Sequence, residues 1–337
     1  MNKRIKAAVV GLSFGGWVIE NELLKEGSKY FEIDSVCDLN EEKAKTWGER
    51  LGVPYYTDMD RLLAERQIGA CVLITGPVGR AKQIDICIDG GIHVMTTKPF
   101  ELTATEAERV LKRAREKGIV VQMNSPSPRP ASYMKAILDY QKRFDLGRPI
   151  AYRAADWCSY REKPDGLWYD DSERCPVAPI FRLGIYMINE VASLMGDVEK
   201  VSVAESRIFT GRPTSDNALV SVLHKNGVVG SIFASFCVND LQHYKCSYEI
   251  NYERGTIYKA VKPRNSETSG NKVSMQVVYT KDGRQYMYEE EIEDSSNYQW
   301  EVFYRCIGGA AYDDLVSDEQ IVAGIRLIEM MKKEKMI

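Results

Sequence analysis

Residues 11–16, GLSFGG, have the composition of a loop that binds the diphosphate of a dinucleotide. The full motif is Gly-x-Gly-x-x-Gly; Gly11 and Gly16 hold its outer positions and Ser13 takes the middle one. The first glycine allows a tight turn, and the third lets the following helix pack closely on the strand. Serine is the smallest alternative at the second position, where its hydroxyl can bond phosphate. The predicted cofactor contacts in this loop are Gly11, Ser13, Phe14, Gly15 and Gly16.

A carboxylate, Asp38, follows the next apolar run and lies about 20 residues after the glycine loop. This placement suits a side chain that accepts hydrogen bonds from the hydroxyls of the adenosine ribose. A carboxylate there also repels a 2′-phosphate, so NAD is favoured over NADP as the cofactor. The alternative is that Asp38 only caps the helix that follows it.

The elements that would position these residues alternate along the first third of the chain. Short apolar runs predict strands at 5–10, 33–37, 70–74, 93–95 and 119–123. Helical patterns lie between them, at 15–26, 41–51, 80–89 and 103–117. This order predicts right-handed βαβ units and a doubly wound parallel sheet, which is an α/β Rossmann domain over residues 1–123.

The pattern changes after SPSPRP at 125–130, where three prolines interrupt the chain. Longer alternating runs follow, with turn pairs at Asn226-Gly227 and Asp282-Gly283 that favour hairpins. One long helix is expected at about 179–195. Residues 124–337 are therefore predicted to form an α+β domain on a mainly antiparallel, open sheet, for substrate binding and oligomerisation.

The run from 90 to 123, which contains Lys98-Pro99 before a helix, resembles the Gfo/Idh/MocA oxidoreductases. The Thr-Gly-Pro turn at 75–77 and RLGIYMIN at 182–189 extend the resemblance over nearly the whole chain. It implies a Rossmann domain, a substrate domain with an open sheet, sugar-like or polyol substrates, and a homodimer or homotetramer formed through that sheet. The cofactor contacts that it implies outside the glycine loop are Thr75, Pro77, Thr97 and Lys98.

The helix at 182–189 departs from the family pattern Asp-x-Gly-x-His-x-x-Asp. Arg182, Tyr186 and Asn189 replace its first Asp, its His and its last Asp. On a helix these three positions share one face, so they could contact a substrate together; the alternative is an ordinary polar helix face. A guanidinium suits a carboxylate or phosphate, so Arg182 predicts an acidic substrate group, unless it forms an internal salt bridge.

Oxidation of a secondary alcohol needs a hydride acceptor and a group that takes the hydroxyl proton. No histidine lies at the expected place, so Lys98 and Tyr186 are the candidates for proton transfer. An aromatic stretch precedes the helix, and Trp157, Tyr160 and Trp168 are expected to stack on a sugar ring. Core packing or a subunit contact is the alternative for these rings.

Composition narrows the remaining function classes. The 337 residues carry a net charge of -3 with no basic stripe and no membrane-length apolar run, so neither nucleic acid nor membrane is an expected partner. The eight cysteines form no Cys-x-x-Cys pair and the three histidines are scattered, which predicts a cytoplasmic protein without a metal site. The leading interpretation is an NAD-dependent oxidoreductase. The alternatives are a hydrolase or lyase that uses NAD for transient oxidation, and a non-catalytic dinucleotide sensor.

Overall fold

The computed structural model describes residues 3–124, 127–160, 162–239, 245–261, 272–293 and 298–334. The chain forms two compact units. The first comprises Met1–Arg129 and Asn297–Asp318, and the second comprises Pro130–Ser296 and Glu319–Ile337. The first unit is thus completed by a segment from near the end of the chain. The proline-rich junction expected at 125–130 falls partly outside the described residues.

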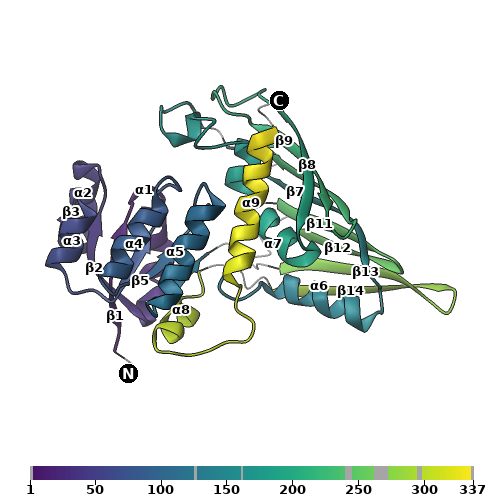
Figure 1. Ribbon diagram of the computed structural model, residues 1–337, viewed down its shortest axis with the longest axis horizontal. Coiled ribbons are helices and arrows are strands. Elements are labelled where there is room, and N and C mark those ends of the chain that lie inside the picture. Colours follow the sequence, from purple (N-terminus) through teal and green to yellow (C-terminus); the bar gives the residue numbers. More distant parts are fainter. Residues whose placement is uncertain are drawn as a thin grey trace. The chain divides into compact units, whose positions relative to one another are not determined.

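The first unit contains a six-stranded parallel sheet in the order β3-β2-β1-β4-β5-β6 (Figure 1). This is the Rossmann order, and it confirms the doubly wound α/β prediction. The order reverses between β1 and β4, so the carboxyl edge there is where such sheets bind ligands. The strands are β1 (Ile5–Val10), β2 (Phe31–Cys37), β3 (Tyr55–Tyr56), β4 (Ala70–Leu73), β5 (His93–Thr96) and β6 (Val121–Met123).

The helices of the first unit are α1 (Ser13–Val18), α2 (Glu41–Leu51), α3 (Met59–Glu65), α4 (Arg80–Asp89), α5 (Ala104–Glu116) and α8 (Trp300–Ile307). The prediction of one helix over 15–26 is wrong, because α1 gives way to a π-helical turn, η1 (Ile19–Leu23), and then to a 3₁₀ turn, η2 (Glu26–Lys29). The backbone N–H of Leu24 donates to the carbonyl of Ile19, five residues back. The wider turn lets both Ile19 and Leu23 reach the core.

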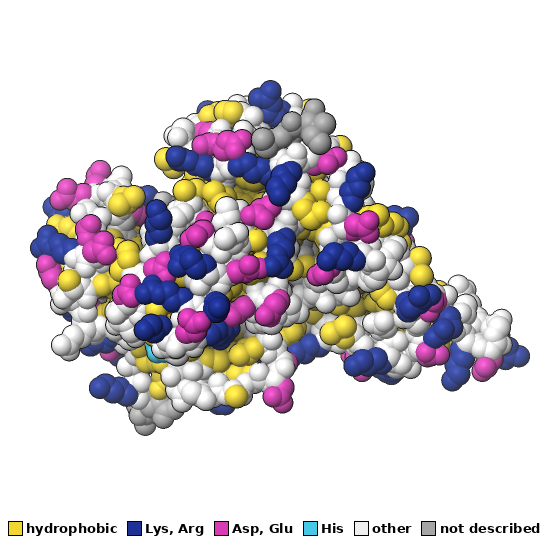
Figure 2. Space-filling model, in the orientation of Figure 1, with side chains coloured by type: hydrophobic (Ala, Val, Ile, Leu, Met, Phe, Trp, Pro, Cys, Tyr) yellow, Lys and Arg dark blue, Asp and Glu magenta, His cyan; other side chains and the backbone are white. Residues whose placement is uncertain are grey.

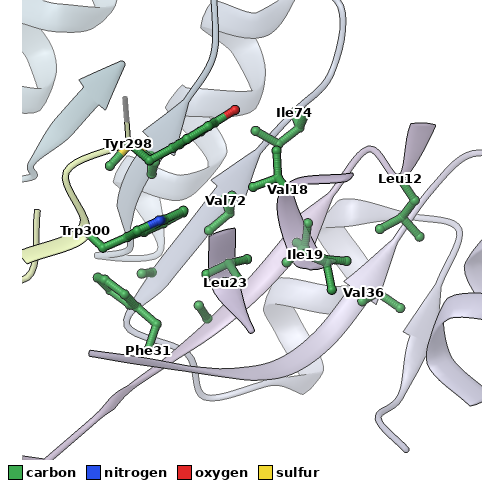
Figure 3. Close-up of a cluster of buried hydrophobic side chains, with 14 of the residues drawn as sticks. Leu12, Val18, Ile19, Leu23, Phe31, Val36, Val72, Ile74, Tyr298 and Trp300 are labelled. Carbon is green, nitrogen blue, oxygen red and sulfur yellow. The ribbon is translucent and has the colours of Figure 1, made fainter. Parts of the chain in front are cut away.

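The core of the first unit joins the glycine-loop region to the segment from the end of the chain. Trp300 and Phe303 of α8 are buried against Phe31 of β2, with ring centroids 5.8 and 5.4 Å away (Figure 3). The indole N–H of Trp300 donates to Glu22 over 3.1 Å. Truncation of a buried aromatic side chain typically costs about 3–5 kcal/mol, so α8 contributes substantially to the stability of this unit.

The second unit is an α+β structure on an eight-stranded sheet in the order β14-β13-β12-β11-β7-β10-β9-β8. All neighbours are antiparallel except β7 and β10, and the hairpins predicted at Asn226-Gly227 and Asp282-Gly283 are confirmed. The strands are β7 (Pro149–Trp157), β8 (Val198–Ser206), β9 (Asn217–His224), β10 (Val229–Ser235), β11 (Lys245–Tyr252), β12 (Gly255–Val261), β13 (Lys272–Lys281) and β14 (Arg284–Glu293).

Helices of the second unit pack on one face of this sheet (Figure 1). They are α6 (Ser132–Arg143), the 3₁₀ turn η3 (Trp168–Asp170), the π-helical turn η4 (Ile180–Gly184), α7 (Ile185–Met195) and α9 (Asp318–Glu334). The single helix predicted over 179–195 is therefore wrong in its first turn. Gly184 at that turn comes close to the sheet, since a Cβ there would lie 3.3 Å from the Cβ of Ala234.

Charged side chains of both signs are interspersed over α4 and α5 (Figure 2). There Arg109 and Arg113 both pair with Asp85, and Arg113 also pairs with Asp89. No helix in the described ranges has the length and apolar character needed to cross a membrane.

Candidate cofactor and substrate sites

The glycine loop turns sharply between β1 and α1. Gly11 has φ +86°, and a Cβ on it would lie 2.7 Å from the carbonyl oxygen of Ile74, so only glycine fits. Gly16 was predicted to let the helix pack closely on the strand, but its close neighbour is instead Trp47 of α2. A Cβ on Gly16 would lie 2.5 Å from the ring of Trp47. It is Gly15 that faces the sheet, with Val9 and Ile74 at ordinary contact distance.

Asp38 closes the loop from the end of β2. Its Oδ2 accepts from the backbone N–H of Leu12 over 2.7 Å, and its Oδ1 accepts from the N–H of Asn40 over 2.9 Å. Helix α2 is capped by Asn40, whose side chain accepts from the N–H of Lys43. The alternative that Asp38 caps this helix is therefore wrong. The half-buried carboxylate lies beside the glycine loop, where a ribose contact is possible.

The predicted loop residues Ser13 and Phe14 lie at the start of α1. The Nζ of Lys43 donates to the hydroxyl of Ser13 over 2.7 Å, which brings a cation to the loop. Phe14 is 48% exposed and stacks on Trp17 at 5.4 Å. The sequence analysis missed Lys43, whose only signal is its position on the first turn of the helix after Asp38.

A buried arginine joins the ends of β4 and β5. Arg80, fully buried, donates to the carbonyls of Thr75, Thr97 and Pro99. Burial lowers the pKa of Arg80 to about 10, although nearby Glu101 opposes this shift. The guanidinium therefore fixes the two turns on which Thr75, Thr97 and Lys98 were predicted to line the cofactor site. Sequence reasoning missed this residue, because nothing in its helical context shows that it is buried.

The other predicted residues at this edge also have defined contacts. The hydroxyl of Thr75 donates to Gln83 over 2.7 Å, and Pro77 is buried in the same turn. Lys98 directly follows the buried Thr97 after β5, and its backbone N–H donates to Asn124 over 3.2 Å. The side chain of Lys98 is half-buried. The structure thus brings the glycine loop, Asp38 and the turns after β4 and β5 to one edge of the sheet.

These features fit a dinucleotide. Gly11 lets the loop turn tightly against the backbone of Ile74, and the loop runs into the N-terminal turn of α1. A diphosphate is bound at such a turn by backbone N–H groups, with further attraction from Lys43. The ribose would be held by Asp38, and the turns at Thr75 and Lys98 would border the other half of the cofactor.

In the second unit, Arg182 forms an internal ion pair. Its Nη1 and Nη2 each lie 2.7 Å from an oxygen of Glu162, and its guanidinium lies 3.8 Å from the ring centroid of Tyr169. Tyr160 and Phe236 complete the aromatic surround at 5.0 Å. Burial lowers the pKa of Arg182, but the hydrogen bonds to Glu162 outweigh it and raise that pKa above the ordinary value. The structure thus shows the salt bridge that the sequence analysis gave as the alternative.

A second arginine organises the loop that carries Glu162. Arg212 is buried and pairs with Asp170 at 2.5 Å and with Asp165 at 3.4 Å. Its Nη2 also lies 3.5 Å from Glu162. Three carboxylates therefore surround two guanidiniums, and this arrangement was missed because its members are far apart in sequence.

The structure brings only some of the predicted aromatic residues together. The ring of Tyr160 lies beside the guanidinium of Arg182, and the ring of Trp168 contacts that of Tyr169 at a tilt, with centroids 4.0 Å apart, so both belong to this cluster. In the β7 alternation, Asp156 lies on the buried face next to Ala234 of β10, so Trp157 lies on the opposite face.

The remaining predicted residues lie on α7. Tyr186 is half-buried, whereas Asn189 is buried and its side-chain oxygen packs against Gly324 of α9. Glu190, the next residue, accepts from the hydroxyls of Tyr133 and Tyr248. These bonds fix α7 to α6 and to β11. Arg182 lies in the π-helical turn η4, whereas Tyr186 and Asn189 lie in α7, so the three residues do not belong to one regular α-helix.

The fold and the first site define a nucleotide-binding unit followed by an antiparallel-sheet unit. Residues 5–125 match the model of an oxidoreductase family with an NAD-binding Rossmann fold, and residues 135–258 match the GFO/IDH/MocA C-terminal domain. The chain belongs to the Gfo/Idh/MocA oxidoreductase family, which confirms the resemblance seen in the sequence.

Relatives within the family are distant. D-apiose dehydrogenase of Paraburkholderia graminis is 22% identical over 69% of this chain, and the chain spans 61% of the length of that relative. 1,5-Anhydro-D-fructose reductase of Ensifer adhaerens is 21% identical over 67% of each chain. The crystal structure of the WlbA dehydrogenase from Bordetella pertussis, in complex with NADH and UDP-GlcNAcA, has the same fold. Its TM-score is 0.71 at 15% identity, over 98% of this chain and 96% of that one.

Proposed function

We propose that this protein is an NAD-dependent oxidoreductase that moves a hydride between the nicotinamide and an alcohol or ketone carbon of a sugar or polyol. The observation that carries the proposal is the glycine loop tied to Asp38 at the carboxyl edge of the β3-β2-β1-β4-β5-β6 sheet. Family membership supports the reaction class. The relatives named for apiose oxidation and anhydrofructose reduction support a sugar substrate.

The cofactor would be held in three parts. Backbone N–H groups of the loop at 11–16, with Ser13 and Lys43, would bind the diphosphate. Asp38 would accept hydrogen bonds from the adenosine ribose and disfavour a 2′-phosphate, which makes NAD the preferred cofactor. Thr75, Thr97 and the buried Pro77 would border the nicotinamide half.

When bound, NAD supplies the hydride acceptor. The chain has to manage the proton of the substrate hydroxyl. We assign proton exchange to the Oη of Tyr186, and we assign orientation of the substrate oxygen and stabilisation of its negative charge to the Nζ of Lys98. The reverse assignment stays open, because two coupled groups share their titration.

Arg182 and its surround would select the substrate. The guanidinium is already neutralised by Glu162, so an acidic sugar would have to displace that carboxylate. A neutral sugar can instead contact the rings of Tyr160 and Trp168. We therefore propose neutral sugars or polyols as substrates, ahead of sugar acids. Trp157 and Asn189 remain predicted substrate contacts. Trp157 lies on the sheet face opposite the buried one, and Asn189 is buried against α9, so neither carries the proposal.

The test is a screen of sugars and polyols with NAD, with formation of NADH followed by absorbance. Net NADH formation supports the proposal. Turnover of substrate without net NADH would instead favour the hydrolase or lyase that oxidises transiently. Cofactor binding with no turnover on any compound would favour the dinucleotide sensor, the interpretation that fits the departures from the family helix pattern at Arg182 and Tyr186.

We also propose that the protein is a cytoplasmic homodimer or homotetramer. Apolar residues are exposed on the sheet face opposite the helices, namely Leu219, Val229, Tyr258 and Met287. All eight cysteines are free thiols, as suits a reducing compartment. Light scattering on the wild type and on Met287→Glu tests the assembly. A wild-type monomer would refute it.

A further inference from the structure

The segment after β5 holds one partly accessible lysine between buried neighbours. From Thr96, the last residue of β5, to Glu101, every residue is buried except Lys98, which is half-buried. Lys98 is the residue proposed to orient the substrate oxygen. The groups that hold this segment therefore decide where the Nζ of Lys98 can reach.

The guanidinium of Arg80 binds the segment on both sides of the lysine. Its Nη1 donates to the carbonyls of Thr97 and Pro99, which are the two neighbours of Lys98 in the chain. Its Nη2 donates to the carbonyl of Thr75 in the turn after β4. One planar group with several donors thus ties two turns together, and it fixes the backbone of Lys98 relative to the turn after β4.

An arginine in this place is costly to the fold. Arg80 is fully buried, and its hydrogen-bond partners are backbone carbonyls rather than a carboxylate. The carboxylate of Glu101 is nearby, but it accepts from the backbone N–H groups of Ala81 and Leu102 over 2.9 and 2.7 Å. Apolar side chains of similar volume often replace buried charges without loss of stability. The cost of burying this charge therefore points to a role in the geometry of the site.

A second side chain holds the backbone N–H of the lysine. Asn124 directly follows β6, and its side-chain oxygen accepts from the N–H of Lys98 over 3.2 Å. The backbone N–H of Asn124 donates to the carbonyl of Thr96 over 3.1 Å, so this acceptor is itself fixed to the end of β5. The backbone of Lys98 is therefore pinned by Arg80, the first residue of α4, and by Asn124 at the end of β6.

We propose that Arg80 and Asn124 are positioning residues that set the place of Lys98 for hydride transfer. This inference rests on the proposed function, in which Lys98 orients the substrate oxygen. Arg80 also holds the turn at Thr75, so it sets the separation of the two turns that border the nicotinamide. Asn124 acts on Lys98 alone. A reacting group misplaced by about 1 Å can cost roughly a hundredfold in rate, so both residues act chiefly on kcat.

The first measurement compares two binding probes, NADH and ADP-ribose, which lacks the nicotinamide. Arg80→Lys keeps the positive charge, but one ammonium group lacks the planar fork that spans both turns. This variant should bind NADH about tenfold more weakly, a change of about 1.4 kcal/mol, and should bind ADP-ribose like the wild type. Asn124→Ala should bind both probes like the wild type, because it leaves the two turns tied together.

The second measurement is steady-state kinetics with NAD and the neutral sugar or polyol that the wild type turns over fastest in the screen. Both variants should lose about 10–100-fold in kcat with little change in the KM of the sugar. A merely structural role would lower the melting temperature without this separation of kcat from KM.

Arg66→Lys is the matched control, since it removes the two-pronged hydrogen bonds of another arginine of the first unit, those from Arg66 to Asp34. It should lower the melting temperature and leave NADH affinity and kcat at their wild-type values.

Wild-type NADH affinity and kcat in Arg80→Lys would overturn the inference while leaving the proposed function standing. An equal loss of affinity for NADH and ADP-ribose would overturn it too, because the arginine would then only support the fold. If Arg80→Lys does not fold, Asn124→Ala decides, and wild-type kcat in that variant overturns the inference. A wild type that binds neither probe would overturn the proposed function and the inference with it.

Discussion

Replacing Gly11 by alanine should abolish tight NADH binding while leaving the protein folded. Two costs add at this position. An alanine in the left-handed region, where Gly11 has φ +86°, costs about 1–2 kcal/mol. The new Cβ would also lie 2.7 Å from the carbonyl oxygen of Ile74, well inside contact distance.

The second cost cannot be relieved by a side-chain rotation, because the contacted atom is backbone. The backbone N–H of Ile74 donates to the carbonyl of Val10 over 2.8 Å, so the strand end is held in place. Overpacking of this kind typically costs a further 1–3 kcal/mol or so. The sum is about 2–5 kcal/mol, part of which is relieved by movement of the loop away from its binding geometry.

The assay combines urea unfolding with a titration of NADH followed by nicotinamide fluorescence. Gly11→Ala should lose roughly 10–100-fold in NADH affinity. This corresponds to about 1.4–2.8 kcal/mol of the cost appearing as a loss of binding free energy, because the loop must return to its strained conformation to bind NADH. Gly52→Ala is the matched control: its φ is +67° and a Cβ there meets nothing within 4 Å. It should lose about 1 kcal/mol of stability and bind NADH normally. NADH binding by Gly11→Ala at wild-type affinity would refute this account of the loop.

Three other outcomes follow from the described contacts. Asp38→Ser should weaken NAD binding roughly tenfold or more and narrow or reverse the preference over NADP, as competitive titration of both cofactors would show. Glu162→Gln should improve the KM for acidic sugars about tenfold by removing the carboxylate that pairs with Arg182, with the KM for neutral sugars unaffected; steady-state kinetics on acidic and neutral sugars checks this. Arg66→Ala should destabilise the protein at neutral pH by roughly 1.5–3 kcal/mol, because the bidentate hydrogen bonds of Arg66 hold the pKa of buried Asp34 below its usual value. That difference is present above about pH 4, the unfolded pKa, and shrinks as the pH falls through the lower folded pKa, which urea unfolding at several pH values would show.

Each of these outcomes has a result that would count against it. Tighter binding of NADP than NAD by the wild type would contradict the role of Asp38. Wild-type turnover of acidic sugars alone, unchanged in Glu162→Gln, would contradict the neutral-substrate proposal. For the ion pair, Arg61→Ala is the control, since Arg61 is 71% exposed and should change stability little. An equal effect of Arg61→Ala and Arg66→Ala would refute the argument from burial.

The sequence predicted the features that local pattern determines. Alternation of apolar runs and helical patterns gave the Rossmann unit, and turn pairs such as Asn226-Gly227 gave the hairpins. Local pattern could not show that Trp300 returns to the first core, because that depends on packing across most of the chain. It also missed the pairing of Arg182 with Glu162, because the helical spacing around Arg182 carries no information about contacts with the loop that holds Glu162. The π-helical turns escaped prediction because they are set by tertiary packing.

The central claim is that Lys98 and Tyr186 act on the oxygen of a sugar-like alcohol whose carbon exchanges a hydride with NAD. A crystal structure with NADH and a turned-over substrate tests it most directly. The account predicts the Lys98 Nζ and the Tyr186 Oη at about 2.6–3.2 Å from the reacting oxygen of the substrate. It also predicts the nicotinamide at the ends of β4 and β5. The claim would be contradicted if both side chains lay beyond hydrogen-bond distance of that oxygen and another residue contacted it instead.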